Sequence, residues 1–195
     1  MIFLTFGTGL GAGLILNGEL YSGTNGMAGE AGHIRLAEDG PVGYGKAGSF
    51  EGFCSGGGIA QLGQVMAEEA LDREEIPSFC QSKGELFKVN ARTIAEAAEK
   101  GDPLALKIYD IVADRLGQGL AILVDLLNPE KIVIGSIFLR QEKLLRTRME
   151  KILNKEALEH SLSVVEVVPA GLGEKLGDYA AVSVGLRAYQ KKQER

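Results

Sequence analysis

The first residues whose types and spacing could do chemistry lie near the start of the chain. Glycines occupy alternate positions from Gly7 to Gly13, and Thr8 stands between the first two. Glycine has no Cβ, so its backbone can approach an anion closely. Successive amides in such a turn can form a concave anion site, and the Thr8 hydroxyl can donate one more hydrogen bond. The segment predicts a loop for nucleotide phosphates; a simple tight turn between two strands is the alternative.

The spacing of these glycines excludes the two commonest nucleotide motifs. The pattern is GxGxGxG rather than GxGxxG, and it leads into Leu14–Leu16 and an Asn17-Gly18 turn instead of a helix. A Walker A motif is excluded as well, because no Gly-Lys-Ser/Thr follows. We therefore expect the loop to connect two strands.

A polar cluster follows the loop. Glu30 and His33 stand three residues apart in a glycine-rich segment, and Glu51 comes eighteen residues after His33. Two carboxylates and an imidazole suit the directional hydrogen bonds that a polyhydroxylated ligand needs, so the cluster predicts sugar recognition. The alternatives are a capping or surface carboxylate for Glu30, a buried histidine for His33, and a plain helix start for Glu51.

The elements that must position these residues alternate between strand and helix. Short apolar runs that indicate strands occur at residues 2–6, 14–16, 19–21, 131–135 and 163–168. Periodic apolar positions indicate helices between residues 58 and 127, at 144–153 and at 178–190. The clearest helix runs from Asp102 to Leu127, with Pro103 after its capping aspartate and Asn128-Pro129 as its stop. This order predicts an α/β lobe.

Composition limits the classes of protein to which the chain can belong. Its 195 residues are 45% hydrophobic and carry a formal charge of −5, which fits one globular domain over residues 1–195. No clustered basic face is evident, so we expect no direct nucleic-acid contact. Cys54 and Cys80 form no CxxC pair, which favours a reducing cytoplasm, and no apolar run is long enough to span a membrane.

The order of the motifs resembles the ROK family of sugar kinases and repressors over residues 1 to about 190. GTGxGxG, the Asn-Gly turn, GxxGxAGExGH, a glutamate followed by Ser-Gly, and NPExIVIG appear in that order. The resemblance implies an α/β actin-like ATPase (ribonuclease H-like) fold and the carboxy-terminal lobe of a sugar kinase. It also implies ATP with Mg²⁺ and a hexose or amino sugar as ligands.

The resemblance assigns roles to residues of this chain. By analogy with the family, the positions that contact ATP phosphates are Gly7, Thr8 and Gly9, with Gly11 allowing the close turn. The positions that match the sugar-binding residues are Glu30, His33 and Glu51. The NPExIVIG segment resembles the part of the fold where adenosine docks, which makes Gly135 a nucleotide contact, and residues 177–180 match a second motif nearby. The family usually has a second glycine where Ser136 stands.

The sequence departs from the family in two places. Many members hold a structural zinc with the histidine of ExGH and three cysteines, but the matching cysteine positions are Val42, Tyr44 and Ser49, so we expect no zinc. The DxGxT motif and the Asn-Asp pair that supplies the catalytic base precede the glycine loop in the family, and no aspartate occurs here before Asp39. We expect no catalytic residue in this chain, and little or no phosphorylation by it alone.

Two other functions and one assembly stay open. A sugar-sensing lobe of a ROK repressor or a non-catalytic remnant would share the same motifs. A homodimer is implied because the helix from Asp102 to Leu127 is apolar around much of its circumference and ROK proteins often pair through this lobe. Full burial of that helix inside the lobe is the alternative.

Overall fold

The computed structural model describes residues 1–173, 179, 182–183 and 186. The expected helix at 178–190 and the motif at 177–180 lie outside the continuous described range. Among the described residues, no helix is both long enough and apolar enough to cross a membrane.

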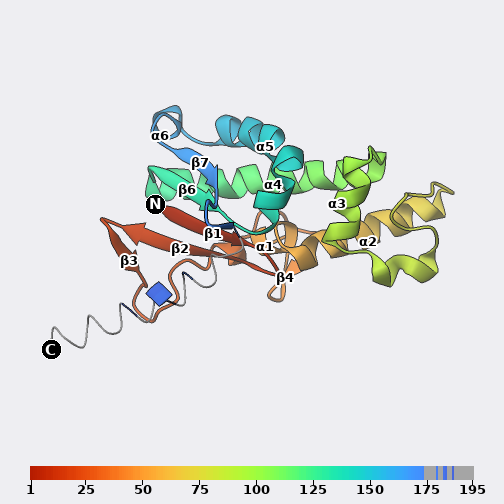
Figure 1. The fold of residues 1–195 in the computed structure, drawn as a ribbon, viewed down its shortest axis with the longest axis horizontal. Helices are drawn as coiled ribbons and strands as arrows, with labels where there is room; N and C mark the ends of the chain where they lie inside the picture. Colours follow the sequence, from red (N-terminus) through yellow and green to blue (C-terminus); the bar gives the residue numbers. More distant parts are fainter. Residues whose placement is uncertain (174–178, 180–181, 184–185, 187–195) are drawn as a thin grey trace.

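A mixed five-stranded sheet forms one end of the molecule (Figure 1). Its order is β3-β2-β1-β6-β7, and its strands are β1 (Ile2–Phe6), β2 (Leu10–Leu16), β3 (Glu19–Tyr21), β6 (Lys131–Ile134) and β7 (Glu166–Pro169). The first three strands form an antiparallel meander, whereas β6 runs parallel to both β1 and β7. The predicted meander and the predicted parallel strand after the long helix are confirmed. β2 begins four residues earlier than predicted, and β7 is shorter than the predicted strand at 163–168.

Side-chain alternation explains why the central strands are buried. Ile2, Leu4 and Phe6 of β1 point into the core, while Thr5 is exposed. In β6, Ile132 lies in register with Ile2, and its neighbour two residues on is also buried. The central strands therefore present a continuous apolar face to the helices.

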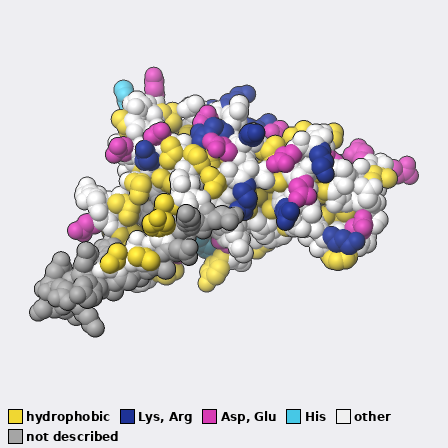
Figure 2. Space-filling model, in the orientation of Figure 1, with side chains coloured by type: hydrophobic (Ala, Val, Ile, Leu, Met, Phe, Trp, Pro, Cys, Tyr) yellow, Lys and Arg dark blue, Asp and Glu magenta, His cyan; other side chains and the backbone are white. Residues whose placement is uncertain are grey.

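The helices and a small hairpin complete the lobe. The helices are α1 (Phe50–Phe53), α2 (Gly56–Asp72), α3 (Ala91–Glu99), α4 (Pro103–Leu127), α5 (Ile137–Glu156) and α6 (Glu159–Leu162). The smaller elements are η1 (Ala31–His33), β4 (Val42–Gly43), β5 (Lys46–Ala47) and η2 (Lys83–Lys88). Figure 1 shows α4 and α5 running beside the sheet, with α2 and α3 toward the opposite end. On the face in Figure 2, described Lys and Arg side chains are interspersed with Asp and Glu.

Helix α4 matches its predicted bounds. Asp102 caps its first turn, Pro103 is its first residue, and Asn128 ends it in the left-handed conformation with φ 40°. Twelve of its residues are buried, and its neighbours include α1, α2, α3 and α5. Packing within the lobe therefore accounts for much of its apolar circumference.

The Asp102 cap gives a prediction for stability. Burial raises the pKa of the Asp102 carboxyl, but hydrogen bonds from the amides of Ala105, Ser78 and Leu104 outweigh it and hold the pKa below its usual value. We expect Asp102→Ala to lower the free energy of unfolding by about 1–2 kcal/mol at pH 7. A folded-state pKa below the unfolded value of about 3.9 means that this contribution is present above about pH 4 and is lost as the pH falls through the folded pKa.

Urea unfolding at pH 7 and at about pH 3 measures this effect. The exposed Asp39→Ala is the control, because the Asp39 side chain makes no hydrogen bond among the described residues. The free energy of unfolding of Asp102→Ala should be clearly below that of the wild type at pH 7, and the difference should shrink at the lower pH. A difference that is the same at both pH values would contradict the capping role.

Helix α5 differs most from its prediction. It was expected at 144–153 but begins at Ile137. Gln141 has non-helical angles (φ −113°, ψ 23°), so the helix is kinked there. The kink shifts the apolar face between the two halves, and this breaks the periodicity by which a helix is recognised in a sequence.

Candidate functional site

A cavity of about 950 Å³ lies where the β1–β2 turn meets the starts of three helices. Gly7 and Thr8 of the turn line it, together with the first residues of α2, α3 and α5. Helix amino termini carry unsatisfied amide hydrogens and the positive end of the helix dipole. The cavity therefore favours an anionic ligand.

The turn itself is tight and fixed to α2. The Gly7 amide donates to the Gly9 carbonyl at 3.0 Å, and the Gly56 amide donates to the Gly7 carbonyl at 2.7 Å. In the described part of the chain, the amides of Thr8 and Gly9 have no hydrogen-bond partner outside the β1–β2 ladder. The turn thus combines both readings of the sequence, since it connects two strands and still offers donors to a ligand.

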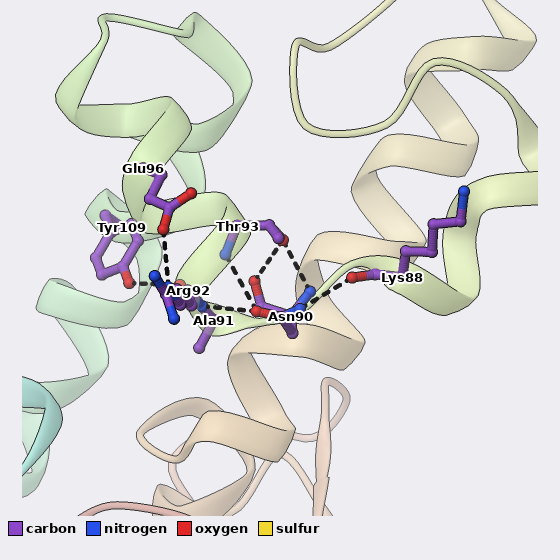
Figure 3. Close-up of polar contacts among 7 residues, drawn as sticks. All are labelled: Lys88, Asn90, Ala91, Arg92, Thr93, Glu96 and Tyr109. Atoms are coloured by element: carbon purple, nitrogen blue, oxygen red, sulfur yellow. Dashed lines mark hydrogen bonds and ion pairs between the residues drawn. The ribbon is translucent and has the colours of Figure 1, made fainter.

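Helix α3 supplies the opposite wall, and its start is rigidly built (Figure 3). The Asn90 side chain accepts hydrogen bonds from the Arg92 and Thr93 amides, and the Thr93 hydroxyl accepts one from the Asn90 amide. The Tyr109 hydroxyl donates to the Ala91 carbonyl at 3.2 Å. Burial, followed by the charge of a nearby glutamate, raises the pKa of Tyr109, which keeps the hydroxyl protonated as a donor.

The charged side chains of the cavity are of both signs. Arg92 and Glu96 of α3 form an ion pair at 2.8 Å. Arg140 of α5 also lines the cavity, and no ion pair joins it to another described residue. Glu99 of α3 lines the cavity as well and also forms no ion pair among the described residues, so the formal side-chain charges of the cavity balance.

Glu51 lies directly behind the β1–β2 turn. Its Oε2 accepts a hydrogen bond from the Leu10 amide at 2.9 Å, and a Cβ on Gly9 would lie only 2.7 Å from the same oxygen. The side chain is partly buried in the first turn of α1. Among the described residues, nothing hydrogen-bonds to its other oxygen, Oε1. Glu51 therefore joins the turn to the polar cluster and keeps an acceptor for a ligand.

The segment that carries Glu30 and His33 packs against β2 and α1. The Ala12 amide donates to the Gly29 carbonyl at 2.8 Å. A Cβ on Gly32 would lie 3.2 Å from the Glu51 Cβ, so this segment passes immediately beside Glu51. The structure thus places the backbone of this segment beside Glu51, and none of the three predicted sugar residues lines the cavity.

One alternative reading of this cluster is wrong, because His33 is exposed rather than buried. Glu30 precedes η1 and its side chain makes no capping hydrogen bond, but it is exposed, as the surface-carboxylate alternative expected. Glu51 does stand in the first turn of a helix, as its alternative expected. That position is also what directs its carboxylate toward the Leu10 amide.

The loop that follows is held by hydrogen bonds around the hairpin β4–β5. The Gln61 side chain both accepts from the Val42 amide and donates to the Val42 carbonyl, at 3.0 Å each. The buried Ser49 hydroxyl accepts from the Gly52 amide, and Lys46 Nζ donates to the His33 carbonyl at 2.7 Å. The Tyr44 ring meets the His33 ring edge-on, with centroids 6.3 Å apart. The described residues include no cluster of three metal-ligating side chains.

The other three predicted nucleotide residues, Gly9, Gly11 and Gly135, do not line the cavity, whereas Ser136 does. Gly11 stands in β2 opposite Thr5, and Gly135 is buried with its amide bonded to the Leu4 carbonyl at 3.0 Å. The sequence did not predict that the start of α3 belongs to the site. The Asn90-x-x-Thr93 capping pattern could have located that helix, although not its place beside the turn.

Comparisons with known proteins agree with this fold. The family model described as "ROK family" matches residues 1–184. A glucokinase of Halalkalibacterium halodurans is 38% identical over 137 residues, which are 69% of this chain and 40% of the relative. An N-acetylglucosamine repressor of Escherichia coli is 32% identical over 179 residues, which are 89% of this chain and 41% of the relative.

A solved structure gives the same result. The crystal structure of a ROK family glucokinase from Streptomyces griseus in complex with glucose and AMPPNP has a TM-score of 0.73 and 29% identity. The likeness covers 89% of this chain and 56% of that one, so the chain spans about half the length of the relatives that it matches, or less. The predicted α/β actin-like fold is confirmed. The chain belongs to the ROK family.

Proposed function

We propose that this chain is the carboxy-terminal lobe of a ROK sugar kinase and binds ATP phosphates and a hexose or amino sugar for ATP-dependent phosphorylation. The observation that carries the proposal is the anion-favouring cavity at Gly7 and Thr8, with Glu51 immediately behind the turn. The glucokinase relatives and the solved structure with glucose and AMPPNP support it. One such lobe over residues 1–195 remains a proposal, as does its pairing into a homodimer.

In this scheme, each group of residues has one task. The turn from Gly7 to Gly9 positions the phosphates, while Gly11 and Gly135 shape the strand ends from behind. The sugar hydroxyls are bound by three side chains, namely Glu30, His33 and Glu51. Mg²⁺ arrives with ATP and offsets phosphate charge. Hydrogen bonds such as those of Gln61 hold the 38–48 loop, so we propose that the loop needs no zinc.

Phosphoryl transfer also requires a base for the attacking sugar hydroxyl. No aspartate is found among the described residues that line the cavity; its carboxylates are Glu96 and Glu99 of α3. Glu96 is already paired with Arg92, and both glutamates belong to the wall that α3 forms. We therefore expect this chain alone to bind its ligands without phosphorylating the sugar.

A second function is favoured by one comparison. The Escherichia coli repressor covers more of this chain, 89%, than does the Halalkalibacterium halodurans glucokinase, at 69%. The chain would then be the sugar-sensing lobe of a ROK repressor. A sensing lobe needs the polar cluster but not the phosphate turn, so nucleotide binding separates the two functions.

Calorimetric titration with AMPPNP tests the kinase proposal through Thr8. The exposed Thr8 hydroxyl lines the cavity, and Thr8→Val removes it with little change of shape. We expect the variant to bind AMPPNP about tenfold more weakly, as fits the loss of one hydrogen bond to a charged group. Thr5→Val is the control, because the Thr5 hydroxyl bonds to Gly11 within the hairpin and does not line the cavity. Sugar binding with no AMPPNP binding by the wild type would favour the repressor function instead.

A further inference from the structure

Ser136 has a backbone conformation that serine rarely adopts. Its angles are φ 56° and ψ −111°, between the buried Gly135 and the first residue of α5. Glycine reaches this region freely, but a Cβ makes it strained. Such strain persists only where the surroundings enforce it, and it is concentrated at functional sites.

The Ser136 side chain does nothing in the described fold that offsets this strain. It precedes α5 but makes no capping hydrogen bond to it. Its hydroxyl has no hydrogen-bond partner among the described residues. The hydroxyl instead lines the cavity, 3.5 Å from where a Cβ on Gly7 would stand.

Two further polar groups of the same wall point to a ligand. The Gln141 Oε1 is inaccessible to solvent and has no hydrogen-bond partner in the described structure, and Gln141 lines the cavity at the kink of α5. Arg140, one helical turn after Ser136, has no ion-pair partner in the same described part. A buried acceptor without a donor destabilises the free protein. Together, these groups make the start of α5 a polar wall that lacks internal partners.

We propose that Ser136 is a binding residue for the nucleotide phosphates. Its hydroxyl donates a hydrogen bond to a phosphate oxygen of the nucleotide held at Gly7 and Thr8. The proposal rests on the nucleotide site of the proposed function. Serine keeps the strained conformation because glycine, which would relieve the strain, has no hydroxyl to offer the phosphate.

Two variants of this residue separate the hydroxyl from the strain. Ser136→Ala removes the hydroxyl and keeps the Cβ, whereas Ser136→Gly removes both. Calorimetry with ADP, with adenosine as the probe that lacks phosphate, measures binding, and thermal unfolding measures stability. We expect both variants to bind ADP about tenfold more weakly and to bind adenosine as the wild type does. Ser136→Gly alone should raise Tm, by about 2–4 °C.

Several results would overturn the proposal. ADP affinity that is unchanged in Ser136→Ala would show that the hydroxyl makes no phosphate contact. Tighter ADP binding by Ser136→Gly would show that the side chain obstructs the cavity. If the folded wild type binds neither ADP nor AMPPNP, the proposed nucleotide site fails together with this inference. Wild-type ADP binding with no difference in the variants overturns the Ser136 role alone.

Discussion

Replacing Glu51 by alanine is expected to lower the affinity for the sugar about a hundredfold. A carboxylate that accepts hydrogen bonds from sugar hydroxyls contributes roughly 1.5–3 kcal/mol for each bond, and two such bonds account for that factor. The variant also loses the acceptor for the Leu10 amide behind the phosphate turn. We therefore expect a smaller loss, of about tenfold, in AMPPNP affinity.

Glu51→Gln separates the two tasks of this side chain. A carboxamide oxygen can still accept the Leu10 amide, so AMPPNP affinity should stay near that of the wild type. Sugar affinity should still fall, because the negative charge is gone and an NH2 donor has replaced one acceptor oxygen. Glu38→Ala removes an exposed carboxylate of the neighbouring loop and is the control. Calorimetry that finds equal sugar affinity for Glu51→Ala and Glu38→Ala would remove Glu51 from the sugar site.

The second large effect concerns Gly29, which fixes the segment that carries Glu30 and His33 to the sheet. Its φ is +94°, and a Cβ would lie 1.9 Å from the Ala12 carbonyl oxygen. The oxygen belongs to the backbone and the backbone sets the position of the Cβ, so the overlap cannot be relieved without disturbing the Ala12–Gly29 hydrogen bond. We expect Gly29→Ala to lower the free energy of unfolding by about 3 kcal/mol or more, from strain plus overlap. Urea denaturation measures the loss.

Gly26→Ala is a matched control for that experiment. Gly26 has a similar φ of +84°, but a Cβ there would meet nothing within 4 Å. Its alanine variant therefore reports the cost of the left-handed backbone alone, about 1 kcal/mol. Similar losses at the two positions would show that the segment is not held against β2 as described.

Glu51 is the residue through which the two halves of the proposed site meet. Its carboxylate contacts the strand that leaves the phosphate turn, and its Cβ lies beside the Gly29–His33 segment. A sugar bound at Glu30 and His33 would thus lie next to the phosphates held at the turn. Proximity of this kind is what transfer between two bound substrates requires.

The sequence predicted those turns and helix ends that depend on residues close together in the chain. The Asn17-Gly18 turn, the Asp102-Pro103 start and the Asn128 stop of α4 each depend on residues a few positions apart. The kinked start of α5 was missed because Gln141 interrupts its periodicity. The loop pattern did not indicate that Gly11 belongs to a strand, since pairing with Thr5 decides that.

The candidate site was predicted in part for the same reason. Residue types and spacing predicted the turn and the polar cluster, because the residues of each lie in short motifs of the sequence. The contact between Glu51 and the Leu10 amide spans 41 positions and follows only from the packing of α1 on β2. The walls contributed by α3 and α5 come from tertiary contacts as well, and so does the strain at Ser136.

The central claim is that this one lobe binds a nucleotide and a sugar side by side. Calorimetric titration of the chain with glucose and with N-acetylglucosamine, in the presence of saturating AMPPNP, tests it most directly. We predict that at least one of the two sugars binds with one site per chain and that Glu51→Ala weakens this binding about a hundredfold. A folded chain that binds AMPPNP and neither sugar, or that keeps its sugar affinity in Glu51→Ala, would contradict the claim.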